Sequence, residues 1–391
     1  RVDRRQRQMC IRDRAEILTD NELLELRYSG KPAAFLRAFK AGYFAILYNF
    51  IVMGWVINAM ASVVSVMLNM DKWTAVWLCV IIALVYAILS GFWGVVVTDL
   101  VQFVIAMFGS IALAIIALNY VGGMEVLLSK LNELFGSDIV TDNTLKFIPP
   151  IPDTGVATQT FWESPFSKFL IFISVMWWSH HGTDGGGYII QRMSSAKNER
   201  HALLATLWFN IAHYALRVWP WIIVAVVSIV MFPIIPSEYS ELGVKAGYPL
   251  VMNTLLGPGL KGILIVSFLA AFMSPIDTHL KWGVSYLIND IYKRFFKPNE
   301  TERHYVLIGK IMTVVLMILA AFTALKMQSI SKAWEFIFAM GAGIGLVLIL
   351  RWFWWRVNAW SEITALATSI VITISFEIIA YFQTINNNLE Y

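Results

Sequence analysis

Long apolar runs alternate with short polar loops along most of the chain. Runs long enough to cross about 30 Å of hydrocarbon as a helix occur roughly nine times. Basic residues gather in every second loop, which the positive-inside rule assigns to the cytoplasm. The pattern therefore predicts an all-α, polytopic membrane protein. The predicted spans are 42–68, 74–89, 100–121, 166–190, 203–232, 260–287, 305–325, 334–350 and 363–381.

The beginning of the chain departs from this pattern. Residues 1–14 read RVDRRQRQMCIRDR, which has no apolar core. This stretch resembles a translated sequencing-adaptor scar more than a signal peptide. Residues 15–391 then form a single predicted transmembrane domain. It enters in mid-protein, so we expect it to be incomplete at its N-terminus.

Composition agrees with the membrane class. Hydrophobic residues make up 58% of the chain and charged residues 14%, and the mean hydropathy is +0.65. The net charge of +4 is small, so nucleic acid is not an expected partner. Two cysteines, Cys10 and Cys79, offer no disulfide framework. We expect a multi-pass, monomeric protein of the plasma (inner) membrane, with the lipid bilayer as its surroundings.

One predicted span carries a concentrated set of oxygen atoms. Ser274, Asp277 and Thr278 follow the i, i+3, i+4 spacing and project from one helical face. Pro275 donates no backbone hydrogen bond, which frees the carbonyl of Ala271 one turn earlier. A carboxylate, two hydroxyls and a free carbonyl are ligands for a hard cation. An ionisable residue at membrane depth indicates an ion or proton pathway.

Two other charged residues bear on this hypothesis. Lys281 follows Asp277 by four residues, so an ordinary helix pair is an alternative that neutralises the carboxylate without any ion. Asp99 lies near the predicted start of another span, in the segment Thr98-Asp99-Leu-Val-Gln102. There it either caps a helix, because an acid favours the N-terminal end of the helix dipole, or serves an ion.

Glycines interrupt the predicted span 166–190. Irregular backbone at membrane depth is tolerated only where it lines a cavity, so the segment predicts a discontinuous helix at a binding site. Two adjacent histidines and an aspartate also suggest a metal, but adjacent residues point to different helical faces, which favours substrate contact or gating. The candidate substrate and gate residues here are Ser179, His180, His181, Asp184 and Tyr188.

A polar stripe marks the span that follows. Asn210, His213 and Arg217 recur at helical spacing and share one face. They form interhelical hydrogen bonds, pair Arg217 with a buried acid, or contact the substrate. The sequence leaves these alternatives open.

Three segments carry a shared pattern: LSGFWGVVVTDLVQ at 89–102, GYIIQRMSSAK at 187–197, and AAFMS at 270–274 with NDIYKR at 289–294. Together they resemble the sodium/solute symporter family, which includes sodium/glucose, sodium/proline and sodium/sialic acid carriers. The resemblance implies the inverted-repeat, leucine-transporter-like helical fold, with substrate and sodium near the bilayer midplane.

The same resemblance implies roles for individual residues. Ser274 and the carbonyl of Ala271 match sodium ligands of the family. Asp99 matches an acid that in some members serves a second sodium position or the exit of the ion. Asp277 and Thr278 fall where those members place hydroxyls of that second position. The expected Na⁺ ligands are therefore Ala271, Ser274, Thr278 and Asp99, with Asp277 supplying further charge.

The chain also departs from the family pattern at two positions. Pro275 stands where a second hydroxyl for the principal sodium is usual, and Lys281 stands where a neutral amide is expected. An ammonium group one turn from the site either repels Na⁺ or replaces it.

The expected function is secondary active transport without covalent chemistry, so the protein is not expected to be an enzyme. Na⁺ enters together with a small organic solute, such as a sugar, organic acid or amino acid, by alternating access, and no cofactor is needed besides the coupling ion. One alternative is proton coupling through Asp277 or Asp99. An alternative of another class is a membrane-embedded sensor or metalloenzyme that uses His180, His181 and Asp184.

Overall fold

The computed structural model describes residues 19–89, 92–136, 148–151, 161–162, 164–179, 183, 187, 189, 193, 195–327 and 330–389. These residues form helices, turns and irregular segments, with no strand among them. In chain order the helices are α2 (Glu22–Arg27), α3 (Gly30–Gly42), η1 (Tyr43–Tyr48), α4 (Asn49–Leu68), α5 (Lys72–Leu89), α6 (Phe92–Val121), α7 (Met124–Phe135), α10 (Pro165–Ile171), η3 (Phe172–Met176), α11 (Trp177–Ser179), α13 (Glu199–Ile211), η4 (Ala212–Leu216), α14 (Val218–Met231), η5 (Ser237–Tyr239), η6 (Gly243–Ala246), α15 (Gly247–Leu255), α16 (Pro258–Ser285), η7 (Tyr286–Phe296), α17 (Glu302–Lys326), α18 (Ile330–Gly341), α19 (Gly345–Leu350) and α20 (Ala359–Leu389).

Six helical segments in the described part of the chain are long and apolar enough to cross a membrane. They are Gly30–Leu68, Val97–Val121, Glu199–Met231, Pro258–Phe296, Glu302–Lys326 and Ala359–Ala380. Two shorter apolar helices, Lys72–Ile88 and Pro165–Met176, overlap the predicted spans 74–89 and 166–190. The predicted span 334–350 is divided in the structure. Helix α18 ends at Gly341 and α19 begins at Gly345, because the glycine-rich sequence GAGIG interrupts the helix between them.

Three of the long segments contain π-helical turns, namely η1, η4 and η7, and the shorter helix Pro165–Met176 contains a fourth, η3. Such turns are rare and occur often at functional sites, because they displace the side chains that follow. Here η3 precedes the broken helix at Ser179, η4 ends directly before Arg217, and η7 carries a buried acid, Asp290.

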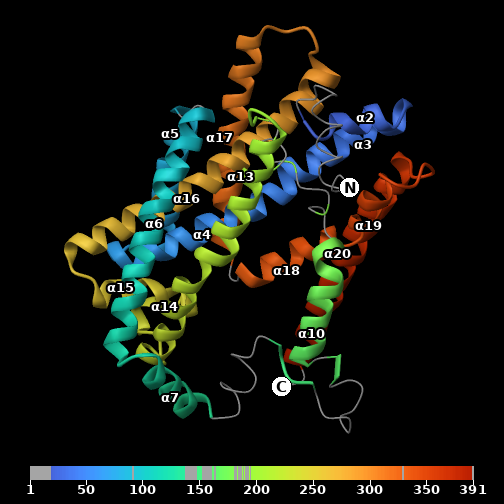
Figure 1. Ribbon diagram of the computed structural model, residues 1–391. Helices are drawn as coiled ribbons and strands as arrows, with labels where there is room; N and C mark the ends of the chain where they lie inside the picture. The colour runs from blue at the N-terminus through green and yellow to red at the C-terminus, as the bar shows by residue number, and fades with distance from the viewer. Residues whose placement is uncertain are drawn as a thin grey trace.

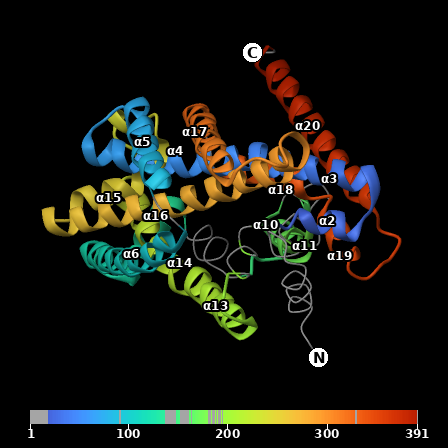
Figure 2. The ribbon, with the colours of Figure 1, turned by 90° about the horizontal axis from the view of Figure 1, so that it is seen from above.

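Helix α16 contributes to three hydrophobic cores, one of them through Trp282 near its end. The first packs α16 against α4, α5 and α17 through residues such as Met53, Ile276 and Met317. The second packs it against α6, α14 and α15 through residues such as Leu113 and Leu264. Figure 1 shows α4, α16 and α17 crossing near the centre, while α18, α19 and α20 lie to one side in both Figure 1 and Figure 2. The helix with the predicted cation ligands is therefore held on two sides.

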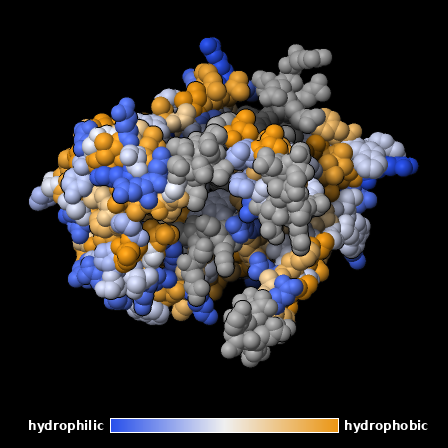
Figure 3. Space-filling model, turned by 90° about the horizontal axis from the view of Figure 1, so that it is seen from below, coloured by the Kyte–Doolittle hydropathy of each residue, from blue (hydrophilic) through white to orange (hydrophobic). Residues whose placement is uncertain are grey.

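Large apolar side chains cover the outside of the helices. On α20, Val371 is 62% exposed and Phe376 is 67% exposed, and Figure 2 shows the end of this helix projecting from the rest. Orange hydrophobic areas also lie on the surface at several sides of Figure 3. Exposed apolar surface on long helices is expected where lipid, rather than water, surrounds the protein.

Candidate cation and solute site

Asp277 and Lys281 form an ion pair inside α16. The ammonium Nζ of Lys281 lies 2.8 Å from Oδ2 of Asp277. The Asp277 side chain is 1% exposed, whereas the Lys281 side chain is 31% exposed. The structure therefore shows the internal pair that the four-residue spacing offers as an alternative to a bound ion. Because the carboxylate is buried, this pair differs from a surface salt bridge.

The predicted cation ligands on α16 lie on a more open face. Ala271 is exposed, and Ser274 and Thr278 are half-buried. The hydroxyl of Thr278 donates to the carbonyl of Ser274 over 2.9 Å. The structure thus brings these three residues to one side of the helix, next to Asp277. Their role as Na⁺ ligands remains a prediction.

Asp99 lies well inside α6 and not at its start. The helix begins at Phe92, and its first turn contains no acidic residue. The interpretation of Asp99 as a helix cap is therefore wrong, because the helix starts about two turns before it. The neighbouring Thr98 hydroxyl makes a 3.0 Å hydrogen bond with the hydroxyl of Tyr86 on α5. Asp99 itself is half-buried on a membrane-spanning helix.

Helix α11 ends at a close backbone contact. Ser179 is buried at the end of α11, and the carbonyl oxygens of Trp178 and Ser179 lie so near Gly345 that a Cβ there would clash with them. Further along, Gly187 lies against the side chains of Trp282 and Tyr286. The remaining predicted gate residues, His180, His181, Asp184 and Tyr188, lie outside the described residues.

Two members of the polar stripe interact within their own helix. The Asn210 amide donates to the carbonyl of Thr206 over 2.7 Å. The His213 ring stacks on Phe209, with the ring centroids 5.2 Å apart. Both contacts are local, and among the residues that the structure describes neither side chain forms the interhelical hydrogen bond that the sequence allows.

Arg217, the third member, differs from the other two. Its guanidinium lies over the ring of Trp221, 5.0 Å from the centroid, and the Trp221 indole donates to Ser110 of α6 over 3.0 Å. Its Nε atom is buried without a hydrogen-bond partner. No acidic side chain in the described ranges forms an ion pair with Arg217, so the predicted pairing with a buried acid is not found there.

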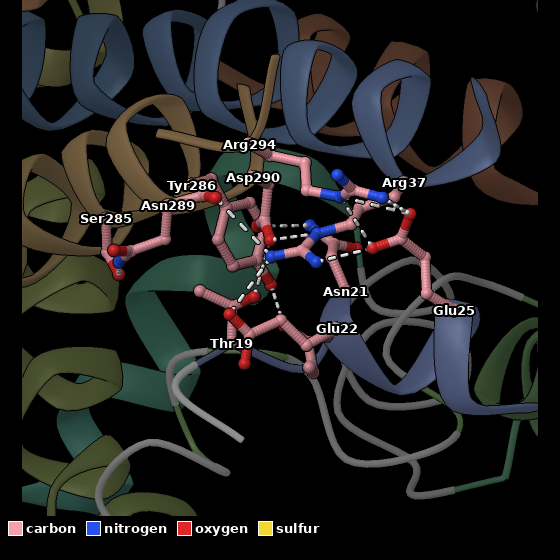
Figure 4. Close-up of polar contacts among 11 residues, drawn as sticks. Thr19, Asn21, Glu22, Glu25, Arg37, Ser285, Tyr286, Asn289, Asp290 and Arg294 are labelled. Atoms are coloured by element: carbon pink, nitrogen blue, oxygen red, sulfur yellow. Dashed lines mark hydrogen bonds and ion pairs between the residues drawn. The ribbon is translucent and has the colours of Figure 1, made fainter. Parts of the chain in front are cut away.

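A second polar centre, which the sequence does not reveal, surrounds Asp290 of η7. Its side chain is completely buried and accepts hydrogen bonds from Thr19 over 2.7 Å, Asn21 over 3.2 Å and Arg37 over 2.8 Å. Figure 4 shows these groups converging on the carboxylate from α3 and from the segment around α2. We call Asp290 and its three partners the inner charge cluster.

Arg37 and Glu25 extend this cluster to the surface. The Arg37 guanidinium lies 3.0 Å from Glu22 and 2.7 Å from Glu25, and Arg294 lies 3.2 Å from Glu25 (Figure 4). Partial burial raises the pKa of the Glu25 carboxyl, but hydrogen bonds and charge from Arg294 and Arg37 outweigh it and lower the pKa. Glu25 is therefore charged at neutral pH and links α2 to η7.

A buried acid on α20 repeats this arrangement. Glu362 is fully buried and accepts from the hydroxyl of Tyr28 over 2.8 Å, Lys40 over 3.3 Å and Arg351 over 3.2 Å. Burial, and then the charge of Glu362, raise the pKa of Tyr28, so its hydroxyl stays protonated and donates. The α2 segment is consequently attached to η7 at one point and to α20 at another.

Sequence reasoning missed both carboxylates for an identifiable reason. It assigned Arg37, Lys40 and Arg351 to polar loops that define orientation, whereas their side chains are buried against acids. The partners are far apart along the chain, so local spacing gives no indication of the pairing. The sequence did contain one indication of these sites. Asp290 and Glu362 each lie at the predicted cytoplasmic end of an apolar run.

Interrupted helices, an ionisable pair and oxygen donors within an apolar helical bundle are features of secondary membrane transporters. Residues 7–371 match the profile of the sodium:solute symporter family, and the chain belongs to that family. Membership places it among transporters rather than enzymes and makes it an integral, multi-pass membrane protein.

Several characterised proteins are similar to the chain. A sodium/mannose cotransporter of Bos taurus is 24% identical, with 88% of this chain and 59% of that protein aligned. The sodium/glucose cotransporter 1 of Oryctolagus cuniculus is 25% identical over 93% of this chain and 57% of its own length. A high-affinity proline transporter of Bacillus subtilis is 24% identical, over 89% and 69%. The chain thus spans less than two thirds of the length of the first two relatives.

A solved structure supports the fold. A Na⁺-coupled sialic acid symporter, in a substrate-bound outward-open state, superimposes with a TM-score of 0.60 over 93% of this chain and 79% of that chain. The sequence identity is 16%, so this likeness concerns the fold alone. It confirms the all-α, leucine-transporter-like architecture that the resemblance implied.

Proposed function

We propose that the protein couples the inward movement of Na⁺ to the uptake of a small organic solute by alternating access. The observation that carries this proposal is the open face of α16, where Ala271, Ser274 and Thr278 present oxygen atoms beside the buried Asp277. Oxygen donors without soft ligands suit a hard cation. We place the protein in the plasma (inner) membrane as a monomer.

The packing of α6 on α16 brings Asp99 into the same region. Gly109 of α6 lies directly against Leu264 of α16. The predicted alternation of loops makes these two helices antiparallel. Asp99 precedes Gly109 by ten residues and Ser274 follows Leu264 by ten, so each lies about 15 Å from that contact on the same side. This supports Asp99 as the acid that supplies charge to the ion.

Membrane potential makes such coupling effective. Each cation that moves inward gains about 2.3 kcal/mol per 100 mV. A bound ion that favours the solute-binding state must, by linkage, be bound more tightly when solute is present. Cation and solute sites on helices packed in one bundle provide the physical basis for this coupling.

We further propose that the solute carries an anionic group, which lies against Arg217. A guanidinium inside a membrane span requires a partner, and Arg217 has no ion pair within the described residues. An organic acid, an acidic sugar or the carboxylate of an amino acid would each satisfy it. The broken helix at Ser179 and the candidates that follow it would line the path to the cytoplasm.

The direct test is uptake into proteoliposomes with Na⁺ replaced by choline. We expect uptake to fall to background, and unchanged uptake would contradict the proposal. Two threonines provide a matched comparison, because Thr278 and Thr313 each donate to the carbonyl four residues earlier over 2.9 Å. Thr278→Val should raise the Na⁺ concentration for half-maximal uptake at least about tenfold, which corresponds to roughly 1.4 kcal/mol. Thr313→Val should leave it unchanged.

A proton-coupled cycle is the second candidate, and the Asp277–Lys281 pair favours it. If the ammonium permanently neutralises this carboxylate, Na⁺ is not needed there, and protonation of Asp99 could drive the cycle. Uptake that follows the pH gradient and ignores Na⁺ would support this candidate over the first.

A further inference from the structure

We propose that Lys281 is a tethered cation: its ammonium permanently occupies the cation position beside Asp277 and thereby reduces the number of mobile ions that the transport cycle uses. The effect on transport rests on the proposed cation-coupled function. It assigns Asp277 and Lys281 to ion stoichiometry and leaves the predicted Na⁺ at Ala271 and Ser274.

The burial of Asp277 provides the first argument. A carboxylate that is 1% exposed on a membrane-spanning helix must be neutralised, either by a cation or by a proton. The Lys281 ammonium supplies the positive charge at 2.8 Å. Its own side chain is 31% exposed, so the lysine extends from a more open region to the buried acid.

The oxygen atoms around this pair provide the second argument. The Thr278 hydroxyl, which donates to the Ser274 carbonyl over 2.9 Å, belongs to the residue next to Asp277. Without the lysine, a carboxylate and a hydroxyl would remain on adjacent residues of one helix. That set is suited to Na⁺, so the chain contains a cation site that its own lysine occupies.

Another buried lysine provides a comparison. Lys40 is also buried and lies 3.3 Å from the buried Glu362, but Arg351 and Tyr28 contact the same carboxylate. Loss of Lys40 therefore leaves Glu362 with a cation and a hydrogen-bond donor. Lys40→Gln is accordingly a matched control for the loss of a buried lysine.

The test measures thermal unfolding of the purified full chain in detergent, titrated with NaCl at constant ionic strength against choline chloride. Lys281→Gln should unfold at a lower temperature in choline than the unchanged protein. Added Na⁺ should raise its unfolding temperature to that of the unchanged protein. Its stabilisation by Na⁺ should reach half-maximum at a concentration at least tenfold lower than in the unchanged protein. Lys40→Gln should show no such gain.

A double variant keeps the result interpretable if Lys281→Gln folds poorly. Asp277→Asn combined with Lys281→Gln removes both charges, so it should fold in choline and lose the added response to Na⁺. The inference is overturned if Lys281→Gln responds to Na⁺ no more than the unchanged protein, or if acid rescues it and Na⁺ does not.

The proposed function and this inference fail separately. If uptake by the unchanged protein requires Na⁺ but Lys281→Gln gains no Na⁺ response, only the inference fails. If uptake ignores Na⁺ while Lys281→Gln gains a Na⁺ response, the inference holds and the sodium-coupled function fails. In proteoliposomes, Lys281→Gln should also carry one more positive charge per solute than the unchanged protein.

Discussion

Asp290 shows how strongly a single buried acid can hold distant segments together. It is fully buried and accepts hydrogen bonds from Thr19, Asn21 and Arg37. Asp290→Asn would remove the charge of the fully buried member among the three carboxylates that contact the Arg37 guanidinium. Breaking a buried pair in this way costs about 3 to 5 kcal/mol, which we expect as a large loss of stability in thermal unfolding.

The control for this prediction is an exposed pair. Glu300 lies 3.3 Å from Lys297, and the two side chains are 35% and 58% exposed. Surface pairs contribute roughly 0 to 1 kcal/mol, so Glu300→Gln should change the unfolding temperature little. Equal losses for the two variants would show that Asp290 does not act as a buried anchor.

Arg217 gives a prediction about solute chemistry. Arg217→Gln should reduce uptake of carboxylate-bearing solutes at least about tenfold, because a charge-assisted hydrogen bond to the solute is lost. Arg217→Lys should retain part of the uptake, since it keeps the charge without the planar fork of donors. The control is Lys261→Gln. Lys261 lies near the start of α16, and its ammonium donates a hydrogen bond to the side chain of Asn253. If neutral and anionic solutes are affected alike, Arg217 has a structural role instead.

At the scale of the helices, α11 and α19 make a close backbone contact next to the predicted gate. Gly345 is the first residue of α19, and the carbonyl oxygens of Trp178 and Ser179 lie against it. A methyl group at this position meets rigid backbone, so Gly345→Ala must move one helix away from the other. We expect Gly345→Ala to lower the rate of uptake and the unfolding temperature together.

A second glycine serves as the comparison for that prediction. Gly262 lies in α16, and a Cβ built there meets no atom within 4 Å. Gly262→Ala should therefore be neutral or slightly stabilising, because alanine favours helix. Normal uptake by Gly345→Ala in proteoliposomes would mean that the contact between α11 and α19 is not needed for the transport cycle.

Element boundaries were predictable wherever apolar runs were long. The predicted spans at 305–325 and 363–381 fall within α17 and α20, because length and hydropathy alone define a helix that crosses lipid. The break between α18 and α19 was not predicted, although its glycines are visible in the sequence. Hydropathy averaged over a window of residues includes the three glycines in the mean, so it does not reveal that the helix is interrupted there.

At the scale of the whole molecule, α16 connects the parts that transport must coordinate. It contributes to three hydrophobic cores, carries the Asp277–Lys281 pair, and continues into η7 with Asp290. The α2 segment and the residues before it then join η7 to α20 through two buried acids, Asp290 and Glu362.

The sequence by itself determined the membrane class, the positions of most helices and the family. It also placed Ser274, Asp277, Thr278 and Lys281 on adjoining turns of one helix, because helical spacing is a local property. Only the tertiary structure decided which charges meet. It buried Arg37 against Asp290 and Lys40 against Glu362, and it paired Asp277 with Lys281. Local spacing could offer that last pair but could not choose it, since the choice depends on the burial of the carboxylate, which packing of distant helices sets.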